Sequence, residues 1–136
     1  LPGLAGFAAA VAEPHDWIAV AARRVALESR LKDGGARIHG EPAPRLPNIS
    51  SIGLPGVAAA TQVMMLDLEG SMVSAGAACS SGKVKSSHVL AAMGLGPAAG
   101  EAIRVSLSPA TSDAEIDAFV AAWLAMATRL GRKGAA

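Results

Sequence analysis

Several residue types on which whole function classes depend are scarce in this sequence. Among its 136 residues it has one cysteine and no tyrosine, and aromatic residues make up only 3%. A single cysteine excludes an internal disulfide and a zinc site built from a cluster of cysteines. With a net charge of +1, the chain lacks the excess of positive charge that draws proteins to nucleic acid or anionic membranes, so we expect neither as a partner.

Long apolar runs and targeting patterns are also missing. No uninterrupted apolar stretch approaches the ~20 residues of a membrane span. No basic segment precedes an apolar one near the N-terminus, as it would in a signal peptide. The lone cysteine is typical of a reducing compartment, and we expect a cytoplasmic protein. The chain opens on Leu1-Pro2-Gly3-Leu4 without an initiator methionine, which is typical of a piece of a longer protein.

Alanine is what the sequence has in abundance. It has 31 alanines, with 51% hydrophobic and 17% charged residues, a composition typical of one folded domain with an aliphatic core. Periodicity, caps and turn residues predict first a helix over 8–32 in which Pro14 begins a second segment, then strands over 36–39 and 48–52. A helix over 57–69, a strand over 71–74 and a loop over 75–82 are predicted next. The rest of the chain is predicted to form a short helix from Ser86 or Ser87 to Met93, a loop over 96–100, a strand over 102–107 and a helix over 113–130. This order predicts an α+β fold, an α/β sandwich in which helices cover a small sheet.

Helical spacing also predicts which side chains are buried. On the first helix the predicted buried stripe is Trp17, Ala21, Val25, Leu27 and Leu31, and the predicted solvent side is Arg23, Arg24, Glu28 and Lys32. The helix over 57–69 takes its apolar bulk from Val57, Met64, Met65 and Leu68. The last helix opens with a capping box from Ser112 to Glu115 and buries Ile116, Phe119, Val120, Trp123 and Leu124. Its early acidic residues, Asp113, Glu115 and Asp117, are expected to complement the helix N-terminus rather than to act in catalysis.

The predicted loop over 75–82 carries the single cysteine, Cys79. A lone cysteine is most often a small buried residue, but this one is surrounded by small residues that cannot anchor a loop in a core. An open loop is where a reactive thiol can reach a substrate, and Lys83 and Lys85 would favour the thiolate if they fold back toward it. His88 could act as a base for the thiol, although a histidine early in a helix is more often a packing or surface residue.

Arg104 interrupts the apolar strand between Ile103 and Val105. Taken alone, the alternation favours an Arg104 side chain that extends to the edge of the sheet. The other interpretation is that its guanidinium binds a carboxylate through two hydrogen bonds. The three histidines have no metal-ligand spacing, so we expect no metal site.

Together these segments resemble a known family. The run from Ser74 to Gly82 (Ser-Ala-Gly-Ala-Ala-Cys-Ser-Ser-Gly), followed by Ser87-His88-Val89-Leu90 and Met93-Gly94, is similar to the active-site cysteine segment of NifS/IscS-type cysteine desulfurases. Further matches follow the family in the same order: Leu1 to Phe7, Arg45-Leu46-Pro47-Asn48-Ile49-Ser50, Pro55-Gly56, Leu66 to Gly70, Val73-Ser74, Ile103 to Ser108, Thr111 and Glu115-Ile116-Asp117. The resemblance covers almost the whole chain, and the cysteine segment is its most specific part.

The resemblance implies the small C-terminal domain of a fold-type I enzyme that uses pyridoxal 5'-phosphate (PLP) to take sulfur from L-cysteine, leaving L-alanine. It implies that Cys79 is the nucleophile that becomes a persulfide, and that Arg104 binds the substrate carboxylate. It also implies a sulfur acceptor, such as an iron–sulfur scaffold protein, and a homodimer of the full-length enzyme.

The large domain that holds PLP in that family has no counterpart in this sequence. The four lysines, Lys32, Lys83, Lys85 and Lys133, lie in the wrong contexts to bind the cofactor. We therefore expect an interdomain linking helix over 1–35, a small domain over 36–131 and a tail over 132–136, which alone bind no PLP and are inactive. Two alternatives stay open: another class V aminotransferase-like enzyme in which Cys79 is incidental, and a non-enzymatic sulfur-relay or interaction domain.

Overall fold

The computed structural model describes residues 2–76 and 86–131. Its elements, in chain order, are α1 (Pro2–Ala12), α2 (Trp17–Asp33), β1 (Arg37–His39), β2 (Ile49–Gly53), α3 (Ala59–Leu68), β3 (Ser74–Ala75), α4 (His88–Ala92), the 3-10 helix η1 (Gly96–Gly100), β4 (Ala102–Ser106) and α5 (Asp113–Gly131). Helices on a small sheet confirm the predicted α+β class. Residues 96–100 form a turn of 3-10 helix rather than a loop, and the strand predicted over 71–74 forms at Ser74–Ala75 instead.

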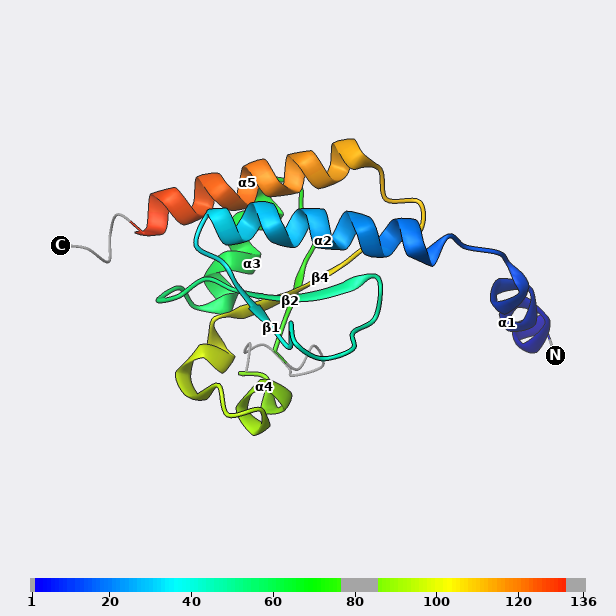
Figure 1. Cartoon of the computed structure of the whole chain (residues 1–136), viewed down its shortest axis with the longest axis horizontal. Helices are drawn as coiled ribbons and strands as arrows, with labels where there is room; N and C mark the ends of the chain where they lie inside the picture. Colours follow the sequence, from blue (N-terminus) through cyan, green and yellow to red (C-terminus); the bar gives the residue numbers. More distant parts are fainter. Residues whose placement is uncertain (1, 77–85, 132–136) are drawn as a thin grey trace.

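The sheet has four antiparallel strands in the order β1-β2-β4-β3, so the last strand in the sequence lies between two earlier ones. Figure 1 shows α2 and α5 side by side along one face of this sheet, whereas α4 lies on the other side. The short helix α1 stands apart from the rest and has no buried residue (Figure 1). Among the described residues, none of the helices combines the length and apolar character that crossing a membrane requires.

Strand register explains where the main core lies. Ile38 of β1, Ile52 of β2, Ile103 of β4 and Ala75 of β3 are aligned across the sheet, and directly opposed residues share one face. Ile52 and Ile103 are fully buried against the helices. Burying each of these side chains is worth about 1.5–3 kcal/mol, so this row fixes which face of the sheet the helices cover.

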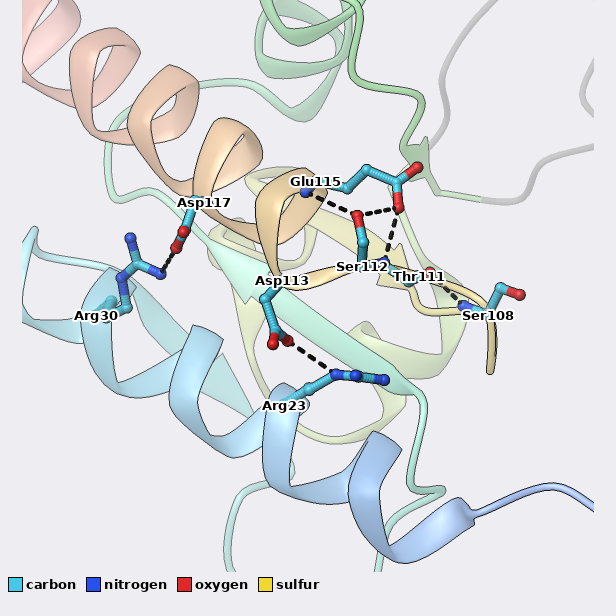
Figure 2. Close-up of polar contacts among 8 residues, drawn as sticks. All are labelled: Arg23, Arg30, Ser108, Thr111, Ser112, Asp113, Glu115 and Asp117. Atoms are coloured by element: carbon cyan, nitrogen blue, oxygen red, sulfur yellow. Dashed lines mark hydrogen bonds and ion pairs between the residues drawn. The ribbon is translucent and has the colours of Figure 1, made fainter.

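The predicted capping box at the start of α5 is confirmed. Ser112 Oγ accepts a hydrogen bond from the Glu115 backbone N–H at 3.3 Å, and Glu115 Oε2 accepts one from the Ser112 N–H at 2.7 Å (Figure 2). The Ser112 hydroxyl also donates to Glu115 Oε2 at 2.8 Å, and the two hydrogen bonds that this carboxylate accepts from the backbone and hydroxyl of Ser112 lower the pKa of Glu115. The two other acidic residues of this region instead reach across to α2, where Arg23 Nε lies 2.9 Å from Asp113 and Arg30 Nη1 lies 2.6 Å from Asp117 (Figure 2).

The N-terminal region differs from the single helix predicted over 8–32. Two helices form instead, with residues 13–16 between them. The Asp16 side chain accepts a hydrogen bond from the Ala19 N–H at 2.9 Å, and this cap sets the start of α2 at Trp17. Pro14 therefore precedes the cap, and the prediction that it begins the second segment was wrong.

The buried face of α2 was also predicted wrongly in part. Leu27 and Leu31 are buried as expected, but Arg24 and Glu28, which were expected in solvent, are only 8% and 3% exposed. Two residues expected in the core are largely exposed instead: Trp17 and Val25. Periodicity failed here because α2 buries a hydrogen-bonded cluster of charged side chains, which a count of apolar residues does not detect.

That cluster joins α2 to the loop before β2. Glu28 Oε1 and Oε2 accept from Arg45 Nη1 and Nη2 at 2.7 and 3.0 Å, and Oε1 also accepts from Arg24 Nη1 at 2.9 Å. Arg24 Nε donates to the Pro47 carbonyl at 3.2 Å. Burial alone would raise the pKa of Glu28, but the hydrogen bonds from Arg45 and Arg24 outweigh it and lower the pKa. The cluster thus fixes the chain just ahead of β2.

Helix α3 also departs from its predicted pattern. Met64 and Leu68 were expected to supply buried bulk, but they are 65% and 81% exposed. The fully buried positions include Gln62 and Leu66. Gln62 Nε2 donates to the carbonyls of Val57 at 2.9 Å and Glu101 at 2.6 Å, so hydrogen bonds to loops on either side orient the helix.

Two leucines of α3 offer a direct test of this orientation. Because Leu66 is fully buried, Leu66→Ala should lower the free energy of unfolding by about 2–5 kcal/mol. Leu68→Ala, on the exposed side, should change it by less than about 0.5 kcal/mol. Urea denaturation of both variants measures the difference, and similar losses would contradict the described packing of α3.

The charge cluster predicts a pH-dependent contribution to stability. The pKa of Glu28 is lower in the folded than in the unfolded chain, so its contribution is present above the unfolded pKa and is lost as the pH falls through the folded pKa. Glu28→Gln should cost about 3 kcal/mol at pH 7, because it leaves two arginines without their counter-charge. Unfolding curves should show this deficit shrinking as the pH falls below 4.

The matched control is Asp117→Asn in the exposed pair with Arg30, which should cost less than about 1 kcal/mol at pH 7. A deficit for Glu28→Gln that stays constant from pH 7 to pH 3 would show that the carboxylate charge does not stabilise the fold.

Candidate functional site

Arg104 lies at the centre of the sheet, on the face opposite the main core. Its neighbours Ile103 and Val105 are buried, whereas Arg104 is exposed, as expected where side chains alternate along a strand. Since β4 pairs with β2 on one side and β3 on the other, Arg104 is not at a sheet edge. Its side chain nevertheless reaches Ser74 of the edge strand β3, which is the direction that the first interpretation of Arg104 expects.

Two serine hydroxyls flank this arginine. Ser51 of β2 and Ser74 of β3 are directly opposite Arg104 on its two sides. Arg104 Nη2 donates to Ser74 Oγ at 3.4 Å, which is at the long limit for a hydrogen bond. Within residues 2–76 and 86–131, no carboxylate forms an ion pair with Arg104. Most of the hydrogen-bonding capacity of the guanidinium thus stays available to a ligand.

His39 continues this polar row on β1, opposite Ser51. Burial, and secondarily the charge of Arg37, lowers the pKa of His39 and favours its neutral form. Its Nε2 lies so close to Gly53 that a Cβ atom there would be 2.7 Å away. His39 is thus packed against the sheet at the far end of the row.

A pocket of about 240 Å³ opens over Arg104, Ser51 and Ser74. His88, at the start of α4, also lines it. This volume is below the ~300–1,000 Å³ typical of sites for drug-sized ligands, so the pocket suits a molecule of amino-acid size. With a guanidinium at its floor, it can bind a small carboxylate.

Helix α4 is attached to the same face by a small core of its own. Leu90, Ala99 and Ala102 are buried together there, separately from the main core. Ser87 Oγ accepts from the Leu90 N–H at 3.3 Å, which confirms Ser87 as the cap of this helix, and the Ser87 N–H donates to the Ala99 carbonyl at 3.4 Å. The cap and this second core hold the helix from which His88 lines the pocket.

Two residues that flank the cysteine segment in the sequence line this pocket. They are Gly76 and Ser87, and residues 77–86 lie between them in the sequence. Cys79, with Lys83 and Lys85, lies outside the described residues, and so does the tail predicted over 132–136. The structure therefore brings together Arg104, Ser51, Ser74 and His88, and it does not place Cys79.

A second cavity, of about 290 Å³, lies between α5 and residues 69–73. Its described lining contains the carboxylates of Glu69 and Glu115 and no cationic side chain. It does not suit an anionic ligand. The part of the chain that the structure describes also contains no group of three or more His, Cys, Asp or Glu residues arranged to hold a metal ion.

The comparisons with known proteins agree with this arrangement. The aminotransferase class V family matches residues 17–119, most of the chain. The chain belongs to the class V aminotransferase family. It is 43% identical over 122 residues to a cysteine desulfurase of Cereibacter sphaeroides, and 37% identical over 126 residues to cysteine desulfurase 2 of Trichormus variabilis. These matches cover 86% of this chain but 32% and 31% of the relatives, so the chain spans about a third of their length.

Solved structures confirm the fold of this class V aminotransferase segment. A NifS-like protein from Rickettsia africae superposes with a TM-score of 0.69 at 32% identity, covering 79% of this chain and 28% of that one. A second NifS-like protein gives a TM-score of 0.66 at 29% identity, covering 80% and 27%. The described elements are thus those of a segment of a fold-type I PLP enzyme, as the sequence predicted.

The family generally uses PLP, but the described residues do not fit a PLP site. The only lysine among them is Lys32, whose Nζ lies 2.5 Å from Glu41 Oε1 near the end of α2. Neither residue lines the pocket over Arg104, and that pocket contains no lysine that could hold the cofactor. We therefore derive no chemical step through PLP from these residues.

Proposed function

We propose that this chain is the small domain, with its linking helix, of a PLP-dependent cysteine desulfurase that converts L-cysteine to L-alanine and carries the sulfur as a persulfide on Cys79. The observation that carries the proposal is the pocket over Arg104. Arg104, from a strand paired on both sides, lines this pocket, and so do Gly76 and Ser87, which flank in the sequence the segment that contains Cys79. The cysteine desulfurase names of the relatives support the same reaction.

In this proposal Arg104 binds the substrate carboxylate. Its planar guanidinium can donate two parallel hydrogen bonds to the two oxygens of a carboxylate, which fixes orientation as well as charge. The hydroxyls of Ser51 and Ser74 lie on either side and can donate to the same oxygens. The arginine is built into a strand paired on both sides, so the carboxylate would be held at a rigid point of the fold.

Cys79 then takes the sulfur. The thiolate attacks the sulfur atom of the substrate, a new sulfur–sulfur bond forms, and the carbon–sulfur bond of the substrate breaks. The electron pair of the broken bond stays on the substrate carbon. That carbon takes a proton and becomes the methyl group of the product, L-alanine. Cys79 is left as a persulfide without any external oxidant.

The remaining parts of the proposal follow from this chemistry. PLP is bound by a large domain, and residues 1–35, 36–131 and 132–136 form the linking region, the small domain and a tail. Helix α2 packs into the main core, so the linking region and the small domain are joined by extensive contacts. A persulfide requires an acceptor thiol, such as that of an iron–sulfur scaffold protein, and we propose a cytoplasmic homodimer as the working enzyme.

The role of Cys79 can be tested in the intact enzyme that contains this chain. After incubation with L-cysteine and digestion without reductant, the peptide that contains Cys79 should gain the mass of one sulfur atom. Cys79→Ser should lose both this mass and sulfur transfer while PLP stays bound, because a hydroxyl cannot carry sulfane sulfur. An unmodified Cys79 in an enzyme that still turns over its amino-acid substrate would favour another class V enzyme with an incidental cysteine.

The role of Arg104 is tested by Arg104→Gln. Losing a charge-assisted hydrogen bond of roughly 1.5–3 kcal/mol should raise KM for L-cysteine by about 10- to 150-fold. Arg37→Gln is the matched control, because Arg37 is exposed on the same face of the sheet but does not line the pocket. Steady-state kinetics of both variants should separate them, and equal effects would rule out a specific carboxylate site at Arg104.

A further inference from the structure

Only two of the described side chains that line the pocket are ionisable, Arg104 and His88. They come from different parts of the fold, Arg104 from the central strand and His88 from the first residue of α4. A bound carboxylate would neutralise Arg104. Among the described residues that line the pocket, the imidazole of His88 is then the ionisable group left to contact another part of the same ligand.

The three histidines of the chain differ in what surrounds them. The Nε2 of His39 is buried against Gly53, and the ring of His15 packs edge-on against Trp17 at 5.5 Å. His88 is exposed and lines the pocket, and its backbone is held by the Ser87 cap. Of the three, His88 alone combines a fixed backbone position with a side chain that a pocket ligand can reach.

We propose that His88 is a substrate-contacting residue that recognises the sulfur-bearing end of the amino acid whose carboxylate Arg104 binds. A neutral imidazole has one nitrogen that accepts a hydrogen bond, and the S–H group of L-cysteine can donate a hydrogen bond to it. The positive charge of Arg104 disfavours placing the substrate ammonium group on this floor. The proposal rests on the proposed function, since it takes L-cysteine as the substrate.

The position of His88 supports this assignment. It directly follows Ser87, which lines the border of the pocket. The opposite arrangement, with the carboxylate at His88 and the thiol over Arg104, would leave the stronger anion site unused. Arg104 and His88 line the same pocket of about 240 Å³, so one ligand bound in that pocket would lie against both side chains. His88 would therefore favour substrates that carry a thiol over those that end in a methyl group.

The test compares L-cysteine with L-alanine, which has the same carboxylate but no thiol. In the intact enzyme, His88→Leu should raise KM for L-cysteine roughly three- to tenfold, as expected for one neutral hydrogen bond, with kcat changed less than about twofold. The inhibition constant of L-alanine should stay within about twofold of the unmodified enzyme. His88→Gln, whose amide oxygen can accept the same hydrogen bond, should recover most of the affinity for L-cysteine.

Two further variants separate the possible outcomes. Arg104→Gln should weaken the binding of L-cysteine and of L-alanine alike. If it weakens the binding of neither, the carboxylate site of the proposed function is wrong. His15→Leu, a histidine outside the pocket, should change neither constant. His88→Leu could instead weaken the binding of both amino acids equally, or of neither, while Arg104→Gln behaves as expected. The proposal for His88 would then be wrong and that for Arg104 would stand.

Discussion

The alternation of side chains along β4 determines both the core and the candidate site. Ile103 and Val105 point into the layer of helices, so Arg104 between them has to point to the opposite face. A shift of one residue in register would bury the guanidinium among apolar side chains and expose two core residues. The large free energy gained by burying the row with Ile52 therefore also holds Arg104 in position. The function proposed for Arg104 depends on the same register that stabilises the fold.

Elements with strong local signals were predicted well from the sequence. The capping box and apolar stripe of α5, and the alternation of β2 and β4, agree with the structure because local pattern and tertiary burial favour the same answer there. Errors arose where tertiary contacts override the pattern. Glu28 is buried because arginines from α2 and from a distant loop satisfy its charge, and Gln62 is buried because loop carbonyls accept its hydrogen bonds.

The candidate site was only partly predictable. Arg104 was found as a charge within an apolar strand, but its partners Ser51 and Ser74 are 53 and 30 positions away in the sequence and are defined only by strand register. The sequence suggests His88 as a base for Cys79, whereas the pocket that His88 shares with Arg104 depends on the packing of α4 against the same face of the sheet. The role of Cys79 stays a prediction from the family resemblance, because the residue lies outside the described chain.

Arg104 and His88, which line the same pocket, differ in how strongly the fold holds them. Arg104 belongs to a strand paired on both sides and backed by the main core, so freeing it requires disrupting much of the domain. His88 is held by a short helix whose core consists of Leu90, Ala99 and Ala102, and these bury far less apolar surface. Segments with few buried contacts open locally at a lower free energy than the global fold. A carboxylate bound at Arg104 would thus meet a rigid part of the fold, whereas the side of the pocket that His88 lines can open locally at a lower free energy.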